Sequence, residues 1–155
     1  MSVLIQGYQL REIAFGSQVI KAAAVVPNGA ETTLFTVTGG AVLVTSLIGK
    51  VTTVFTSTAT TLTMGPKPTT GTANASGIHD ETVLTSAALG SWVVPALADG
   101  IATAGIVADG IAWLQNGSGF VCDAGTIEYE ASAANTGQIE WYLTYVPLDT
   151  GASVS

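Results

Sequence analysis

Residues 125–146, GTIEYEASAANTGQIEWYLTYV, carry the clearest strand pattern in the chain. Apolar and polar side chains alternate in both of its halves, residues 125–131 and 138–146, which is the pattern of strands with one buried face. The side chains on the apolar face are Ile127, Tyr129, Ile139, Trp141, Leu143 and Tyr145. Because Asn135-Thr136-Gly137 stands between the halves, the sequence predicts a hairpin with a medium-length turn.

The other face of this predicted hairpin is acidic. It carries Glu128 and Glu130 on the first strand and Glu140 on the second, together with Tyr142 and Thr144. Three carboxylates could bind a cation or a basic partner. A solvated outer face explains them at lower cost, and it is the interpretation we favour.

Upstream, residues 22–72 are dominated by Val, Thr, Ala, Leu and Gly, and the β-branched residues among them favour sheets. Turn residues divide this region into expected strands at residues 18–26, 32–38, 41–48 and 51–55. Gly49 is expected to mark a bend or bulge. Residues 65–77 are expected to form a long exposed loop. The fold class predicted is therefore all-β, a β-sandwich or jelly-roll-like domain over residues 18–155, with residues 1–17 as an extended N-terminal arm or edge strand.

Charge is unusually sparse for a chain of 155 residues. Only 10% of residues are charged while 48% are hydrophobic, whereas about 25% are charged in an ordinary soluble domain. Either a neutral surface of Thr and Ser or a surface covered by neighbouring subunits would account for this, and we favour the second. The net charge of −7 opposes binding to nucleic acid, and the four basic residues are scattered.

Other function classes find little support. The charge-free residues 32–49 and 83–98 are interpreted as buried strands rather than membrane spans. Residues 1–15 contain Arg11 and Glu12 and do not resemble a signal peptide. A single Cys122 excludes an intramolecular disulfide and is interpreted as a core residue. With one His79, no metal or other cofactor is expected.

No motif predicts an enzyme. Asp149-Thr150-Gly151 resembles the active-site triplet of aspartic proteases, but it has no second copy and only four residues follow it. His79 lacks a nucleophile in a recognisable motif. The repeated string ADGIA, with Asp99 and Asp109, lacks the closely spaced carboxylates of a calcium loop and is interpreted as two turns.

Aromatic residues leave one alternative open. Trp92, Trp113 and Trp141 could stack on sugars, or they could be core and interface anchors, which is the interpretation we favour.

Two segments resemble parts of small virion structural proteins of tailed bacteriophages: LFTVTGGAVLVTSLIG at residues 34–49 and YLTYVPLD at residues 142–149. The resemblance is one of style and carries no catalytic motif. It implies a decoration or cement protein on the outer surface of the phage head, assembled in the host bacterial cytoplasm. The partners implied are the major capsid protein and further copies of the chain, commonly as a homotrimer. The alternative is a tail or fibre module that binds a host glycan.

On this hypothesis the N-terminal segment docks on a neighbour by strand addition. The expected interface residues are Val3, Leu4, Ile5, Tyr8, Leu10 and Trp92.

Overall fold

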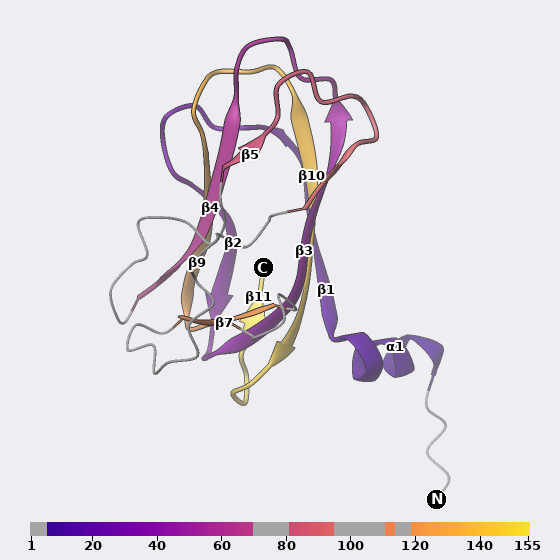
Figure 1. The fold of residues 1–155 in the computed structure, drawn as a ribbon. Coiled ribbons are helices and arrows are strands. Elements are labelled where there is room, and N and C mark those ends of the chain that lie inside the picture. The colour runs from indigo at the N-terminus through magenta and orange to yellow at the C-terminus, as the bar shows by residue number, and fades with distance from the viewer. Residues whose placement is uncertain (1–5, 70–80, 95–110, 114–118) are drawn as a thin grey trace, which may run out of the picture.

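A computed structural model describes residues 6–69, 81–94, 111–113 and 119–155, whose strands form two antiparallel sheets (Figure 1). Sheet A has the order β1-β10-β3-β8-β7, with β6 also paired to β3. Its strands are β1 (Ser17–Val25), β3 (Val42–Thr53), β6 (Trp92–Val93), β7 (Ile111–Trp113), β8 (Phe120–Cys122) and β10 (Gln138–Pro147). Sheet B has the order β11-β2-β9-β4-β5. Its strands are β2 (Thr32–Thr38), β4 (Thr61–Pro68), β5 (Thr82–Val83), β9 (Gly125–Ala131) and β11 (Ser153–Val154).

The chain passes repeatedly from one sheet to the other. β1, β3, β8 and β10 lie in sheet A, whereas β2, β4, β5 and β9 lie in sheet B, so most connections between these strands cross from one sheet to the other. Within the larger sheets, the orders β1-β10-β3-β8 and β2-β9-β4-β5 resemble the two four-stranded sheets of a jelly roll. The predicted fold class, an all-β sandwich of this kind, is confirmed.

The core lies between the sheets and is apolar. Its largest fully buried side chains include Trp141, Phe35 and Phe55. The rings of Tyr129 in sheet B and Trp141 in sheet A meet edge to face, with their centroids 6.4 Å apart, so an aromatic pair joins the two layers.

Gly49 makes room for this aromatic pair. It lies opposite Trp141 in the register between β3 and β10, and a Cβ at Gly49 would come within 3.0 Å of the indole ring. The bend or bulge expected at Gly49 is therefore wrong. The glycine lies inside one continuous strand because only a residue without a side chain leaves space for the ring.

The predicted hairpin is also wrong, although both of its strands begin where expected. β9 belongs to sheet B and β10 to sheet A, so the two strands face each other across the core instead of pairing. Buried Asn135 shapes the connection, because its Oδ1 accepts hydrogen bonds from the N–H groups of Thr56 (3.0 Å) and Gly137 (3.2 Å). The glutamates consequently divide between two faces: Glu128 and Glu130 lie on sheet B and Glu140 on sheet A.

The loop expected at residues 65–77 begins later than predicted. Gly65-Pro66-Lys67-Pro68 completes β4 and pairs with β9. Among the described residues, β5 pairs with β4 only at Thr61 and Leu62, and no described strand pairs with the other side of β4 at its two prolines. Proline is tolerated at such positions because it cannot donate to a neighbouring strand. Residues 70–80 lie outside the described part.

Within the predicted N-terminal arm, residues 7–15 are helical rather than extended, and residues 1–5 lie outside the described part. Residues Gly7–Phe15 form helix α1, which ends where the Gly16 N–H donates to the Glu12 carbonyl at 2.9 Å. Gly16 has φ +89°, and a Cβ there would lie 2.3 Å from the Tyr145 carbonyl oxygen. Glycine is thus required at the joint between α1 and β1, as is common just beyond the end of a helix.

Candidate functional site

A row of apolar side chains crosses the outer face of sheet A. Ile20 of β1 lies opposite Tyr142 of β10, and Tyr142 lies opposite Ile48 of β3. Trp92 of β6 joins the row, because its ring centroid is 6.1 Å from that of Tyr142. Ile20 is 54% exposed and Trp92 is 57% exposed, so these large side chains meet solvent in the isolated chain.

A second apolar row crosses the same face closer to one end of the sandwich. Val146 of β10 lies opposite Leu43 of β3, which lies opposite Val121 of β8. The row between the two is polar but uncharged, with Thr144 opposite both Gln18 and Ser46. We call the apolar members of both rows the apolar face: Ile20, Leu43, Ile48, Trp92, Val121, Tyr142 and Val146.

The two charged side chains beside the first row are both engaged with its aromatic rings. The Lys50 ammonium group lies 5.8 Å from the centroid of the Trp92 ring, a cation–π distance. The Tyr142 hydroxyl donates to the Glu140 carboxylate, and this hydrogen bond, with a smaller effect of desolvation, raises the pKa of the phenol. Because Lys50 and Glu140 are opposite in sign, they add no net charge to the face.

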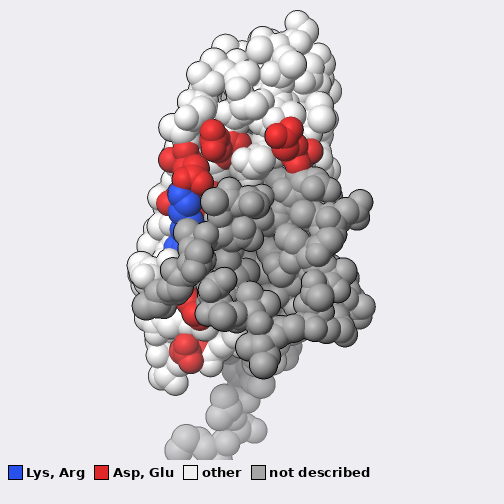
Figure 2. Space-filling model, turned by 60° about the vertical axis from the view of Figure 1, so that its left-hand side comes forward, with Lys and Arg blue, Asp and Glu red and all other residues white. Residues whose placement is uncertain are grey.

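The outer face of sheet B is polar in the described strands except at Val83 of β5, which is 69% exposed. Side chains that point away from the core there are Thr33, Thr36, Thr38, Thr61, Thr63, Lys67, Thr126, Glu128, Glu130 and Ser153. Figure 2 brings this side of the molecule forward and shows acidic groups gathered around a basic one. The two sheets therefore present opposite chemistry to their surroundings.

An ion cluster organises the charge on sheet B. The Lys67 ammonium group contacts the Glu31 carboxylate and lies 2.9 Å from that of Glu128. The hydrogen bond to Glu31, followed by that to Glu128, raises the lysine pKa. Burial raises the Glu128 pKa, but the hydrogen bonds from Lys67 and Thr126 outweigh it, and the net direction is down.

Helix α1 stands away from the sandwich, beyond the end of β1 and on the side of sheet A (Figure 1). Its exposed apolar side chains include Leu10 at 53%, Ile13 at 74% and Phe15 at 71%. An isolated helix of fewer than about 12 residues is marginal in water. A nine-residue helix with its apolar side chains uncovered is therefore expected to need a packing partner.

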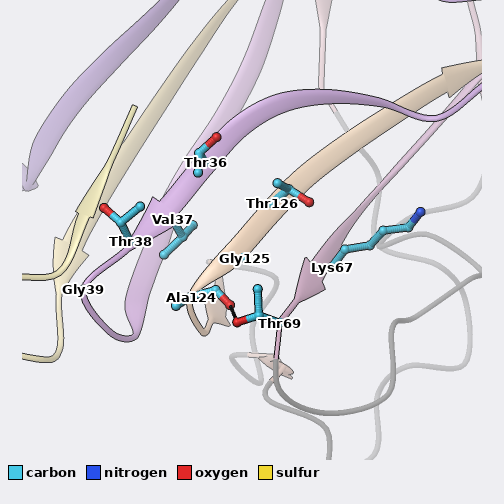
Figure 3. A pocket seen from close by; sticks show the side chains of 9 residues that line it. All are labelled: Thr36, Val37, Thr38, Gly39, Lys67, Thr69, Ala124, Gly125 and Thr126. Atoms are coloured by element: carbon cyan, nitrogen blue, oxygen red, sulfur yellow. Dashed lines mark hydrogen bonds between the residues drawn. The ribbon is translucent and has the colours of Figure 1, made fainter.

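A pocket of about 420 Å³ opens between the ends of β2, β4 and β9 (Figure 3). Thr69 closes part of it by donating its hydroxyl to the Ala124 carbonyl at 2.8 Å. Its lining contains hydroxyl groups and Lys67 but no aromatic ring: Thr36, Val37, Thr38, Gly39, Lys67, Thr69, Ala124, Gly125 and Thr126. The stacking platform of a sugar site is thus missing from this pocket.

The candidate reactive residues that the structure describes have structural partners. The Asp149 carboxylate accepts a hydrogen bond from the Ala41 N–H at 2.7 Å, and the turn that follows it leads into β11. Cys122 is fully buried, as predicted, and burial followed by the charge of Asp123 raises the pKa of its thiol to about 12. Within the described ranges, no group of three or more His, Cys, Asp or Glu side chains could hold a metal ion. His79, Asp99 and Asp109 lie outside them.

The predicted interface residues fall in three places. Trp92 is exposed on the outer face of sheet A, and Leu10 is exposed on α1. The backbone of Tyr8 is part of the same helix. Val3, Leu4 and Ile5 lie outside the described residues. Sequence reasoning missed Ile20, Ile48 and Tyr142. One signal was available in the sequence: Tyr142, an aromatic residue, lies between Glu140 and Thr144 on the face of β10 that was predicted to be polar.

Comparisons with known proteins identify no relative: no family model, no curated protein and no solved structure matches the chain. Among the described helical residues, no segment has the length and hydropathy needed to cross a membrane.

Proposed function

We propose that this chain is a structural subunit of a phage particle, a decoration or cement protein that binds the outside of the head and bridges major capsid subunits. One observation carries the proposal: two rows of apolar side chains cross the outer face of sheet A, whereas that of sheet B is largely polar. An exposed apolar patch of this kind marks an interaction surface. Its aromatic residues are typical of interface anchors.

The phage assignment itself is supported by the resemblance of residues 34–49 and 142–149 to small virion proteins. A cement subunit must hold neighbouring subunits together, which favours well-packed apolar contacts over mobile surface charges. A jelly-roll sandwich with one apolar face and one hydroxyl-rich face meets that requirement. In this proposal sheet B faces solvent, and the apolar face is covered in the assembled particle.

The direct test is binding to phage heads that lack the protein. Purified chain is mixed with such heads, the particles are separated from free protein, and the bound copies are counted and imaged. The proposal expects saturable binding at regular sites and heads that withstand higher temperature. Absence of binding at saturating protein would contradict it.

The exposed pair Trp92 and Tyr142 favours one other candidate, a tail or fibre module that binds a host glycan. This alternative predicts sugar binding that Trp92→Ala abolishes. A glycan array with the unmodified protein and with this variant separates the two functions, because a cement protein gives no signal on it.

A further inference from the structure

Two features of the described residues expose apolar side chains. Helix α1 exposes Leu10, Ile13 and Phe15, and the apolar face exposes Ile20, Trp92 and Val146. Gly16 allows the joint between α1 and β1 to lie close to β10, since a side chain there would collide with the Tyr145 carbonyl. In this arrangement the helix projects from the sandwich (Figure 1).

We propose that copies of this chain exchange their N-terminal helices, with α1 of one copy packed on the apolar face of the next. One contact then covers both features, and every copy gives a helix and receives one. Such an exchange closes into a symmetric assembly without a second kind of protein. The inference rests on the proposed assembly role and names the first partner in it, a second copy.

Length supports this occupant. The row from Ile20 through Tyr142 and Ile48 to Trp92 crosses the adjacent strands β1, β10, β3 and β6, and at about 4.8 Å between strands it spans about 14 Å. Helix α1 has nine residues and at about 1.5 Å each is also about 14 Å long. The helix can therefore lie along this row.

Charge supports it as well. The chain carries a net charge of −7, so two copies repel each other unless the contacting surfaces are neutral. Lys50 and Glu140 cancel on the apolar face, and the sequence of α1 contains one Arg11 and one Glu12.

The first experiment measures the mass of the full chain in solution with three single variants. Ile13→Glu places a charge on α1, Ile20→Glu places one on the apolar face, and Val83→Glu is the control. Val83 is 69% exposed, close to the 74% of Ile13, but lies on β5 of the other sheet. We expect an oligomer for the wild type and for Val83→Glu, and at least tenfold weaker association for the other two. A monomeric wild type, or oligomers that resist both Ile variants, would overturn the inference.

The second experiment tests which surfaces meet. Chains with Ile13→Cys are mixed with chains with Ile48→Cys, and a short bis-maleimide is added. Native Cys122 contributes no background, because it is buried and its thiol pKa is raised to about 12. A cross-linked dimer that contains one chain of each kind is expected; none would form if α1 docks elsewhere.

The two experiments distinguish a failure of the helix exchange from a failure of the proposed function. If the chain proves monomeric yet still binds heads, the helix exchange is wrong and the cement role stands. If it forms the expected oligomer but ignores heads, the exchange stands and the cement role is wrong.

Discussion

Replacement of Asn135 by alanine should show how strongly the crossing from sheet B to sheet A depends on one buried amide. Asn135 is 7% exposed and makes three hydrogen bonds. Its Oδ1 accepts from the N–H groups of Thr56 and Gly137, and its Nδ2 donates to the Thr60 hydroxyl at 3.0 Å. The side chain thus ties the β9–β10 connection to the one between β3 and β4.

The expected loss follows from these contacts. At about 1 kcal/mol for each hydrogen bond, Asn135→Ala should lower the free energy of unfolding by about 3 kcal/mol. For a domain of this size that corresponds to a fall in Tm of about 6 to 12 °C. Calorimetry or urea unfolding measures the change. The matched control is Asn28→Ala, since Asn28 is exposed and should cost under about 0.5 kcal/mol.

Asn135→Asp refines the test. A carboxylate can still accept from both backbone N–H groups, but it loses the Nδ2 donor and places a charge in a buried site, so Asn135→Asp should also destabilise the fold. If Asn135→Ala is no worse than Asn28→Ala, the amide does not organise the connection and the reasoning is wrong.

Three further changes test other parts of the fold. Gly49→Ala should cost about 1 to 3 kcal/mol in urea unfolding, because its Cβ would overlap the Trp141 ring; a neutral result would contradict the tight packing. Lys67→Met should lower the Tm mainly between the ordinary pKa values of Glu128 and Lys67. The ion cluster lowers the Glu128 pKa, which stabilises the fold above pH 4.5, and raises the Lys67 pKa, which stabilises it below pH 10.5. The difference in Tm between wild type and this variant should therefore be largest between these values and shrink as pH falls below the first or rises above the second; a difference independent of pH would rule out the ion cluster as its source. Asp149→Ala should lower stability by about 1 to 2 kcal/mol through loss of the bond to the Ala41 N–H, whereas Asp149→Asn, which keeps an acceptor, should lose less.

Strand positions were largely predictable because each strand carries its own signal. Residues 32–38 and 125–131 coincide with β2 and β9, and alternation assigned Ile127 and Tyr129 correctly to the core. Pairing was less predictable. The turn residues before Gln138 fit a hairpin as well as a crossing, and only the burial of Asn135 against Thr60, 75 positions earlier in the chain, distinguishes them. Such a contact leaves no trace in local periodicity.

Helix α1 escaped prediction for a related reason. The apolar residues of GYQLREIAF are as compatible with an arm or strand as with a helix, and neither an acidic first turn nor a basic last turn marks its ends. Its C-terminal signal is Gly16. The need for glycine there comes from the Tyr145 carbonyl, more than 120 residues away, and becomes apparent only in the folded chain.

The apolar face was unpredictable residue by residue because each strand contributes only one or two of its members. Ile20 and Ile48 stand alone among polar neighbours, and they become a surface only when β10 brings Tyr142 between them. Composition nevertheless predicted such a surface. With only 10% charged residues, the surface of the chain must be rich in hydroxyl groups or be covered by other subunits. In the described strands, hydroxyl groups and paired ions dominate the outer face of sheet B, whereas two apolar rows cross that of sheet A. If a partner covers this chain as we propose, sheet A is the face on which it should bind.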